Sequence, residues 1–372
     1  MKPHLCFVSP YIYPSLVAGS GAAHAGGAEL QQALIARLLA RDGYPVSVLT
    51  RDFGQAQRVD LDGIAIHKLP AAGRRGVKGL RWLTPRLTDV SAALRRLAPD
   101  VVYLRTASAY AAAAAWYATR HRARFFYAGA SDTDFGASRE RHVTPRDWWL
   151  YQWGLRRATT VLTQNCQQSQ ELAAVHGRQG QLCPNFLIDA QAGHGAADGP
   201  VVWVGTIRQL KRPQLFLELA RRLPQRRFVL VGGAEVDAGG DALVAAVRQQ
   251  AAALPNLEMR GYVPPQQVGA VFDGAAALIN TSTHEGFPNT FLQAWIRGVP
   301  SLSFVNPEVQ PGRGGTLACA DVDQMAAALG ALLADAGAWQ ARSAHVRQHF
   351  DHYHNEAAAL RRYQQLLAGA PA

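Results

Sequence analysis

The sequence predicts an α/β protein built from two doubly wound, mainly parallel sheets. Its 372 residues suit two domains of ordinary size. Hydrophobic residues make up 48% of the chain and charged residues 17%, so each domain can bury a core. Short apolar runs alternate with longer amphipathic runs in both halves, which is the pattern of strands and helices in a parallel sheet.

The first half, residues 1–188, is expected to form one domain. Its short apolar runs predict strands at Leu5–Val8, Val46–Thr50, Ile64–Leu69, Val101–Leu104, Phe125–Ala128 and Thr160–Leu162. The amphipathic runs between them predict helices, among them Ala28–Arg41, Thr84–Leu97 and Ser108–Arg120. Residues 189–200 are rich in Gly, Ala and Asp and hold no large apolar side chain, so they predict a linker.

The same alternation restarts in residues 201–350, which predict a second domain. Its expected strands are Val201–Val204, Phe228–Val231, Ala277–Ile279 and Ser301–Phe304. Its expected helices are Pro213–Leu223, Asp241–Leu254 and Asn289–Arg297. Residues 351–372 predict a C-terminal helix that can pack back on the first domain. Because open parallel sheets bind ligands at the carboxyl ends of their strands, we expect the active site in a cleft where the two domains face each other.

The positive charge of the chain is concentrated in its first half. The formal net charge is +11. Residues 1–190 carry 23 Lys and Arg against 13 Asp and Glu, whereas residues 191–372 carry 15 against 14. This asymmetry favours an anionic partner, such as a phosphate-bearing substrate or an acidic lipid, and the alternative is a solvated Arg-rich surface. Nucleic acid is not an expected partner, because no recognition module is present.

The cysteines and the apolar runs indicate the cellular compartment of the protein. The four cysteines have no CxxC spacing, so they predict neither a zinc site nor a redox motif and suit a reducing compartment. The first apolar run ends near Pro10, which argues against a secretion signal. The longest apolar stretch, Ala107–Ala118, is too short to span a bilayer. We therefore expect a cytoplasmic protein.

The most specific motif spans residues 284–295 and has the sequence H-E-G-F-P-N-T-F-L-Q-A-W. Glu285 follows a predicted strand and precedes a helix start, where free backbone amides can hold an anion. The run resembles the signature of the GT-B glycosyltransferases of family 4, E-G-F-P-N-x-F-L-E-A-W. Gln293 stands where that signature has a second Glu, which accepts hydrogen bonds from the ribose. A Gln carbonyl can still accept one bond, without charge assistance.

What this resemblance implies is a pair of Rossmann-like domains and a set of site residues. Glu285 is implied to be a catalytic residue that orients the hydroxyls of the donor sugar. The residues implied to bind substrate are Gly286, Phe287, Pro288, Asn289, Thr290 and Gln293.

A second motif, V-G-T-I-R-Q-L-K-R-P at residues 204–213, opens the second domain as strand, loop and helix. It resembles the family's V-G-R-L-x-x-x-K-G stretch, whose Arg and Lys bind the donor diphosphate. Lys211 aligns with the Lys, whereas Thr206 takes the place of the Arg and Arg208 comes two residues later. The resemblance implies catalytic roles for Lys211 and Arg208 and a place for Gly205 in the binding loop. A solvated loop charge is the alternative for Arg208.

Three shorter elements match the same family. Gly26 and Gly27 open the first long helix and resemble a G-G-A-E element whose backbone approaches the donor phosphates or the acceptor. Tyr262 and Val263 follow Gly261 in a stretch that resembles the loop holding the nucleobase. Residues 183–185, C-P-N, resemble the P-N pair that closes the first domain.

The first domain lacks the His that many family members place against the reacting sugar. Asp132 and Ser131 lie nearest to its expected position, after the run 125–128. Asp132 and Asp134 also form a D-x-D pattern, which other glycosyltransferases use to bind a metal. The pattern occurs three times in this chain, so it is weak. The second-domain motifs imply metal-independent binding of the diphosphate by cations and helix amides, with no metal and no cofactor.

The resemblance implies a retaining glycosyltransferase that moves a sugar from a nucleotide-sugar donor to a saccharide or a polyprenyl-diphosphate-linked acceptor. Such an enzyme would act in the synthesis of a bacterial surface polysaccharide or glycolipid. Basic and aromatic residues gather in the segments 74–86 and 139–157, and they suit either an anionic membrane surface or a solvated helix with inward-packed Trp residues. Two alternatives remain open, namely a nucleotide-sugar epimerase of the same fold and a non-catalytic nucleotide-sugar-binding protein.

Overall fold

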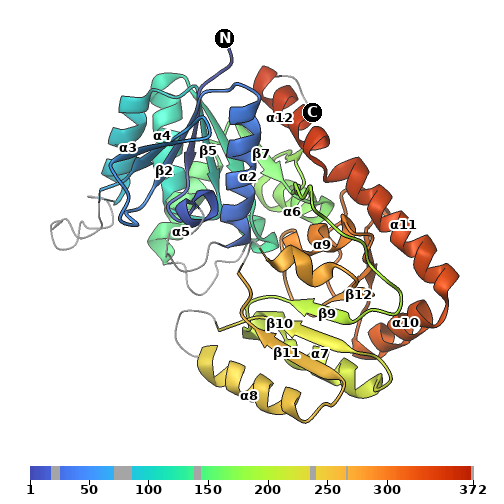
Figure 1. Cartoon of the computed structure of the whole chain (residues 1–372). Helices are drawn as coiled ribbons and strands as arrows, with labels where there is room; N and C mark the ends of the chain where they lie inside the picture. Colours follow the sequence, from blue (N-terminus) through green and yellow to red (C-terminus); the bar gives the residue numbers. More distant parts are fainter. Residues whose placement is uncertain (18–25, 71–85, 138–143, 235–239, 265–266, 370–372) are drawn as a thin grey trace. The chain divides into compact units, whose positions relative to one another are not determined.

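The computed structural model describes residues 1–17, 26–70, 86–137, 144–234, 240–264 and 267–369, and it divides the chain into two compact units (Figure 1). The first unit comprises Met1–Asn185 together with Ala359–Ala372. The second unit comprises Phe186–Ala358. Each unit is an α/β domain with its own sheet and its own apolar core.

The sheet of the first unit has the strand order β3-β4-β2-β1-β5-β6-β7-β8. Its strands are β1 (Leu5–Val8), β2 (Val46–Thr50), β3 (Arg58–Leu61), β4 (Ile64–Lys68), β5 (Val101–Arg105), β6 (Arg124–Ala128), β7 (Thr160–Thr163) and β8 (Gln181–Leu182). All neighbours pair in parallel except β3 and β4, which form an antiparallel pair. β1, β2 and β5 are buried along their whole length, as expected for parallel strands covered on both faces.

Helices cover both faces of this sheet, with α2 opposite α3 and α4 (Figure 1). The helical segments are α1 (Tyr13–Leu16), α2 (Gly27–Arg41), α3 (Arg86–Leu97), α4 (Tyr110–His121), η1 (Asp132–Phe135), α5 (Pro145–Leu155), α6 (Cys166–His176) and α12 (Glu356–Ala368). α4 and α5 pack closely because Gly154 lacks a side chain, since a Cβ there would lie 2.4 Å from the backbone of Ala111. The last carbonyls of α12, those of Leu366 and Leu367, accept hydrogen bonds from Arg124 at 3.1 and 2.8 Å.

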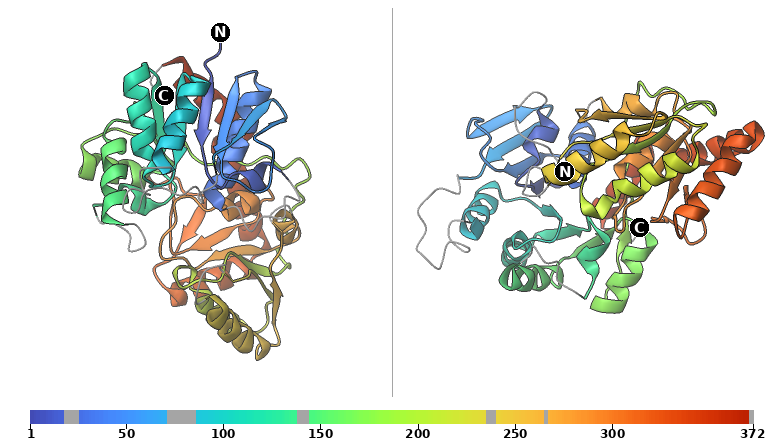
Figure 2. Two further views of the ribbon diagram at one scale, coloured as in Figure 1. Left: turned by 90° about the vertical axis from the view of Figure 1, so that its left-hand side faces the viewer. Right: turned by 90° about the horizontal axis from the view of Figure 1, so that it is seen from below.

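The sheet of the second unit has the order β11-β10-β9-β12-β13-β14 and is parallel throughout. Its strands are β9 (Val201–Val204), β10 (Phe228–Val231), β11 (Leu257–Gly261), β12 (Ala277–Asn280), β13 (Ser301–Ser303) and β14 (Thr316–Ala318). Its helical segments are η2 (Gln209–Lys211), α7 (Pro213–Arg222), α8 (Gly240–Ala252), η3 (Val268–Phe272), α9 (Asn289–Trp295), α10 (Val322–Ala334) and α11 (Ala336–Tyr353). Helices flank the strands of this sheet as well (Figure 2).

These two parallel sheets confirm the predicted fold class, and every predicted strand is present within two residues of its expected ends. No prediction covered the edge strands β3, β11 and β14, the short β8, or the helices α5, α6, α10 and α11. β3 and β11 alternate between exposed and half-buried residues, so they lack an apolar run. Of the predicted helix 84–97, residues 84 and 85 lie outside the described residues.

The segment 189–200, expected to be a linker, belongs to the second unit and contains no helix or strand. Its backbone is tied to that unit, because Gly195 N donates to Arg297 O at 2.9 Å and Ala196 N donates to Ala275 O at 3.0 Å. The chain passes from the first unit to the second between Asn185 and Phe186, slightly earlier than the predicted boundary at 188. Residues 359–372 are part of the first unit, whereas α11 is part of the second.

Candidate functional site

The second sheet changes winding direction between its two central strands. From β9 the chain adds β10 and β11 on one side and then returns to place β12 on the other side of β9. At such a switch point the loops leaving the two strands diverge, and the carboxyl ends of the strands form a natural ligand site. The loop after β9 carries Gly205, Arg208 and Lys211, and the loop after β12 carries Glu285.

Lys211 and Glu285 meet at this switch point. Lys211 Nζ donates a hydrogen bond to Glu285 Oε1, and the two side chains are only 17% and 14% exposed. Glu285 Oε1 also accepts from Ser282 Oγ at 2.7 Å and from Asn280 Nδ2 at 3.4 Å. The structure therefore brings two predicted catalytic residues into direct contact, on loops from neighbouring strands.

The surroundings of Glu285 keep its carboxyl group ionised. Burial by itself raises the pKa of Glu285, because a carboxylate loses hydration in the protein. The positive charge of Lys211 and the hydrogen bonds from Lys211, Ser282 and Asn280 act in the opposite direction and together outweigh burial, so the pKa lies below its ordinary value. The result is a preorganised pair of opposite charges in a half-enclosed site, of the kind that can bind both a phosphate and a hydroxyl.

Two residues that the sequence analysis missed tie the loops together. Trp203 on β9 donates through Nε1 to Thr281 Oγ1 at 3.0 Å, and Thr281 Oγ1 in turn donates to Lys211 O at 2.6 Å. One step further, Thr283 N donates to Leu210 O at 3.0 Å. The position of Thr281 directly after a buried strand was the available signal, but its partner is 70 residues away in the sequence.

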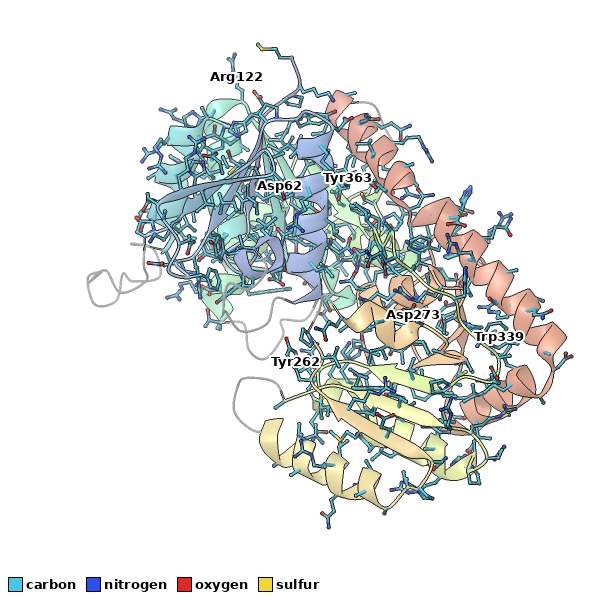
Figure 3. All side chains as sticks on the ribbon, in the orientation of Figure 1. Asp62, Arg122, Tyr262, Asp273, Trp339 and Tyr363 are labelled. Atoms are coloured by element: carbon cyan, nitrogen blue, oxygen red, sulfur yellow. The ribbon has the colours of Figure 1, made fainter. Side chains whose placement is uncertain are left out.

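Two glycines near these loops, Gly232 and Gly261, occupy positions that a residue with a side chain could not take without strain. A Cβ on Gly232, after β10, would lie 2.1 Å from Gly205 O, so the loops after β9 and β10 can touch only through glycine. Gly261 ends β11 with a φ of +71°, a left-handed conformation that favours glycine, and Tyr262 follows it. The ring of Tyr262, labelled in Figure 3, is 51% exposed. Val263 follows it and is half-buried.

The rest of the signature forms the start of α9. Gly286 and Phe287 precede the N-cap residue Pro288, which makes no side-chain capping bond, and α9 begins with Asn289 and Thr290. Phe287 is buried and packs edge-on against Trp295 at 5.9 Å between ring centroids. In this motif Phe287 therefore anchors the loop.

Two further predicted residues lie on the segments that carry the ion pair, Gln293 on the helix after Glu285 and Arg208 in the loop before Lys211. Gln293 lies on α9 and is half-buried, and its side chain makes no hydrogen bond with the described residues. Its carbonyl accepts from Arg297 Nη1 at 3.1 Å. Arg208 is the N-cap residue of η2, and its carbonyl accepts from Lys211 N at 2.9 Å. Arg208 thus lies in the same short loop as Lys211.

Of the predicted residues of the first unit, Asp132 lies just beyond the carboxyl end of β6, and Gly26 and Gly27 lie at the start of α2. Asp132 begins η1 after β6, and its Oδ1 accepts from Asn165 Nδ2 and Gln168 Nε2, each at 3.2 Å. Gly26 is the N-cap residue of α2 and Gly27 its first residue. A Cβ on Gly26 would lie 2.7 Å from Glu29 Oε2, so a carboxylate of the same helix reaches back to this N-terminus.

Asp134 is unavailable for the metal that a D-x-D pattern would suggest. It is buried, and its Oδ2 accepts from Ala130 N at 2.6 Å and from Tyr127 Oη at 3.3 Å. It closes the capping box of η1 together with Ser131. Across the described ranges, no group of three or more His, Cys, Asp or Glu residues is arranged to hold a metal ion.

Family comparisons match both halves of the chain. Residues 26–185 match a family described as glycosyl transferase 4-like domain, and residues 199–335 match one described as glycosyl transferases group 1. Together the two matches cover most of the chain. The chain therefore belongs to the glycosyltransferases with the GT-B fold, as the sequence motifs predicted. A search of curated proteins finds no significant match.

Several solved structures share this fold over the whole chain. Sucrose-phosphate synthase from Thermosynechococcus elongatus is 18% identical with a TM-score of 0.77, covering 99% of this chain and 100% of its own. Anabaena HepE in complex with UDP-glucose is 14% identical with a TM-score of 0.69, covering 99% and 100%. The catalytic domain of starch synthase IV from Arabidopsis thaliana, bound to ADP and acarbose, is 13% identical with a TM-score of 0.69, covering 99% of each chain.

Proposed function

We propose that this glycosyltransferase moves a sugar from a nucleotide-sugar donor to a saccharide or lipid-linked acceptor with retention at the anomeric carbon. The observation that carries the proposal is the Lys211–Glu285 pair at the switch point of the second sheet. A diphosphate needs fixed cations and a sugar needs a fixed hydrogen-bond acceptor, and this pair offers both within one site. Structures with UDP-glucose and ADP are known for proteins of the same fold, which supports the assignment.

In this proposal the donor is held by the loops of the second unit. Lys211 and Arg208 bind the diphosphate, assisted by Gly205 and by the amides at the start of α9, so no metal is needed. Glu285, kept ionised, accepts hydrogen bonds from the hydroxyls of the donor sugar. The exposed ring of Tyr262, with Val263, contacts the nucleobase, and Gln293 accepts one hydrogen bond from the ribose.

The chemistry requires that charge on the leaving diphosphate is stabilised as the glycosidic bond breaks. In this proposal Lys211 and Arg208 supply that stabilisation, and the contact with Glu285 holds Lys211 in position beforehand. The acceptor hydroxyl attacks the anomeric carbon from the side that the diphosphate leaves. Its proton passes to a diphosphate oxygen, the new C–O bond replaces the broken one, and the nucleoside diphosphate departs. This front-face route needs no protein nucleophile.

The acceptor is assigned to the first unit. Asp132 stands where many family members have a His, and its position at the carboxyl end of β6 supports a role in contacting the acceptor. Gly26 and Gly27 at the start of α2 contribute backbone amides to the same function. A polyprenyl-diphosphate acceptor would bring its own negative charges to this basic half of the chain, in the synthesis of a surface polysaccharide or glycolipid.

Association with an anionic membrane surface is part of the same proposal. α5 exposes Trp149 at 63%, whereas Trp153 is half-buried against the core and has the Arg157 guanidinium carbon 4.1 Å from its ring centroid. An exposed Trp on a segment that also carries Arg suits the interface of an anionic bilayer. No described helix is long and apolar enough to cross a membrane.

The epimerase alternative is not favoured by the site. An epimerase needs two free carboxyl groups for proton transfer. Asp134 is instead buried and accepts hydrogen bonds from Tyr127 and from backbone amides. A non-catalytic sugar-nucleotide-binding protein would keep Lys211 and Glu285 but show no turnover.

A donor panel tests the proposal directly. The protein is incubated with UDP-, ADP- or GDP-glucose and a saccharide acceptor, and release of the nucleoside diphosphate is measured. NMR of the product then gives the configuration at the anomeric carbon. Turnover with an acceptor and retention of the donor configuration are expected. An inverted product would contradict the retaining assignment, and donor epimerisation without any acceptor would support the epimerase.

A further inference from the structure

Arg212, the residue after Lys211, has a backbone conformation that is unusual for an arginine. Its φ is +45° and its ψ is +53°, which is the left-handed region that glycine adopts without steric cost. The motif that residues 204–212 resemble has glycine at this position. A side chain at such a position strains the backbone, and the strain persists only where surrounding contacts stabilise it.

The guanidinium of Arg212 spans the ends of two neighbouring strands. Arg212 Nε donates to Thr281 O at 2.8 Å and Arg212 Nη2 donates to Ser282 O at 3.3 Å, both just beyond β12. The guanidinium carbon also lies 4.9 Å from the ring centroid of Phe304, just beyond β13. Because Arg212 itself follows η2, one side chain joins the loop after β9 to the ends of β12 and β13.

These contacts bear on both members of the ion pair. Lys211 is the residue immediately before Arg212, and its carbonyl is held by Thr281 Oγ1. Ser282, whose carbonyl accepts from Arg212, donates its own hydroxyl to Glu285 at 2.7 Å. Moving Arg212 would therefore move the backbone that carries Lys211 and release the turn that supports Glu285.

We propose that Arg212 is a positioning residue that fixes Lys211 against Glu285, so that the diphosphate meets a preformed site. The inference rests on the proposed nucleotide-sugar site and adds a role for a residue at which this chain departs from the glycine of the resembled motif. Two of its donors are used on backbone carbonyls and its plane lies against a phenyl ring, so Arg212 acts through Lys211 and Glu285. This planar arrangement of donors is specific to arginine, because the three donors of a lysine ammonium all radiate from one nitrogen.

Arg212→Gly is the informative variant, because glycine keeps the backbone relaxed while removing the guanidinium. Arg212→Ala removes the guanidinium and leaves a strained backbone. Arg212→Lys keeps the positive charge but loses the planar guanidinium. Arg122→Gly is the matched control, since Arg122 also has a positive φ of +55° but is exposed at the end of α4 in the first unit (Figure 3).

The measurement compares a nucleoside diphosphate with its nucleoside, by titration calorimetry. UDP, ADP and GDP are each tried with the wild-type protein, and the one that binds is used with all variants. Arg212→Gly and Arg212→Ala are expected to weaken diphosphate binding and to lower kcat/KM by roughly 10- to 100-fold, as for misplaced catalytic groups. Binding of the nucleoside is expected to stay unchanged. Arg212→Lys is expected to fall between wild type and glycine, and Arg212→Ala to melt below Arg212→Gly.

The outcomes separate this inference from the function on which it rests. If none of the three diphosphates binds the wild-type protein, the proposed function and the role of Arg212 both fail. Suppose instead that one diphosphate binds the wild-type protein. If Arg212→Gly then binds that diphosphate with the same affinity as the wild type and the control Arg122→Gly, only the positioning role is overturned. Equal loss of diphosphate and nucleoside binding in Arg212→Gly would also overturn it, because that pattern reports general unfolding of the site.

Discussion

Lys211 Nζ and Glu285 Oε1 are hydrogen-bonded although the two residues are 74 positions apart in the chain. Their contact follows from the strand order, because β9 and β12 are neighbours in the sheet while two other strands separate them in the sequence. Each residue lies a short loop beyond the carboxyl end of its strand. The fold therefore creates the charged pair at the point where the winding of the sheet reverses.

Replacing Lys211 by Met should separate the catalytic from the structural part of this contact. Loss of one preorganised charge is expected to lower turnover by about a hundredfold or more. It also leaves Glu285 without its cation, which should destabilise the fold by up to about 3 kcal/mol. The double variant Lys211→Met, Glu285→Gln removes both charges and is expected to regain stability, measured by chemical unfolding, without regaining turnover. Full turnover of the single variant would contradict the role of Lys211.

Gln293→Glu tests whether α9 contacts the ribose. Gln293 is half-buried on α9 with no side-chain hydrogen bond among the described residues. A carboxylate there would accept charge-assisted bonds from two ribose hydroxyls, and tighter binding of the preferred nucleoside diphosphate is expected by calorimetry. The matching 2′-deoxynucleotide should lose that gain. Equal affinities of variant and wild type for the ribonucleotide would place Gln293 away from the ribose.

His349 should make the stability of the second unit depend on pH. Burial, and then the charges of His345, Arg342 and His352, lower the pKa of His349 from 6.5 to about 4. The folded state thus binds fewer protons than the unfolded state between these values. The contribution to stability is complete above pH 6.5 and declines by about 3 kcal/mol as the pH falls to about 4.

The variant His349→Leu, which cannot titrate, should flatten this dependence when unfolding free energies are compared between pH 7 and pH 4.5. His194→Gln is the control, because His194 is exposed in the same unit and is not among the charges that act on His349. If His349→Leu and the wild type lose the same stability on acidification, the burial of a neutral His349 is not the cause.

Membrane association is expected to depend on the exposed aromatic residue of α5. Trp149→Ala should weaken binding to vesicles that contain anionic lipid without lowering the melting temperature, since the ring is exposed. Trp148 is the control, because it packs on Tyr151 at 5.3 Å and supports the core instead. Each Lys or Arg near the surface contributes about 1 kcal/mol, so binding should weaken in high salt. Binding that ignores lipid charge and salt would contradict a membrane role.

The sequence was sufficient to predict the fold because the inner strands of both sheets are short, buried apolar runs, such as β1 and β10. It also identified Glu285 and Lys211 through runs whose spacing is specific. It could not identify Thr281, Trp203 or Arg212, because their roles depend on partners in other loops. The arginine itself gives no signal of its positive φ, and the hint lies in the glycine that the resembled motif has at this position. The binding roles of Asp132, Gln293 and Tyr262 stay predictions.

The central claim is that the Lys211–Glu285 site binds the diphosphate of a sugar nucleotide. Isothermal titration of the wild-type protein and of Lys211→Met with UDP, ADP and GDP tests it most directly. We predict that at least one of the three binds the wild type and that its affinity falls by about a hundredfold in the variant. Equal affinity of the two proteins for that nucleotide, or no binding of any of the three to the wild type, would contradict the claim.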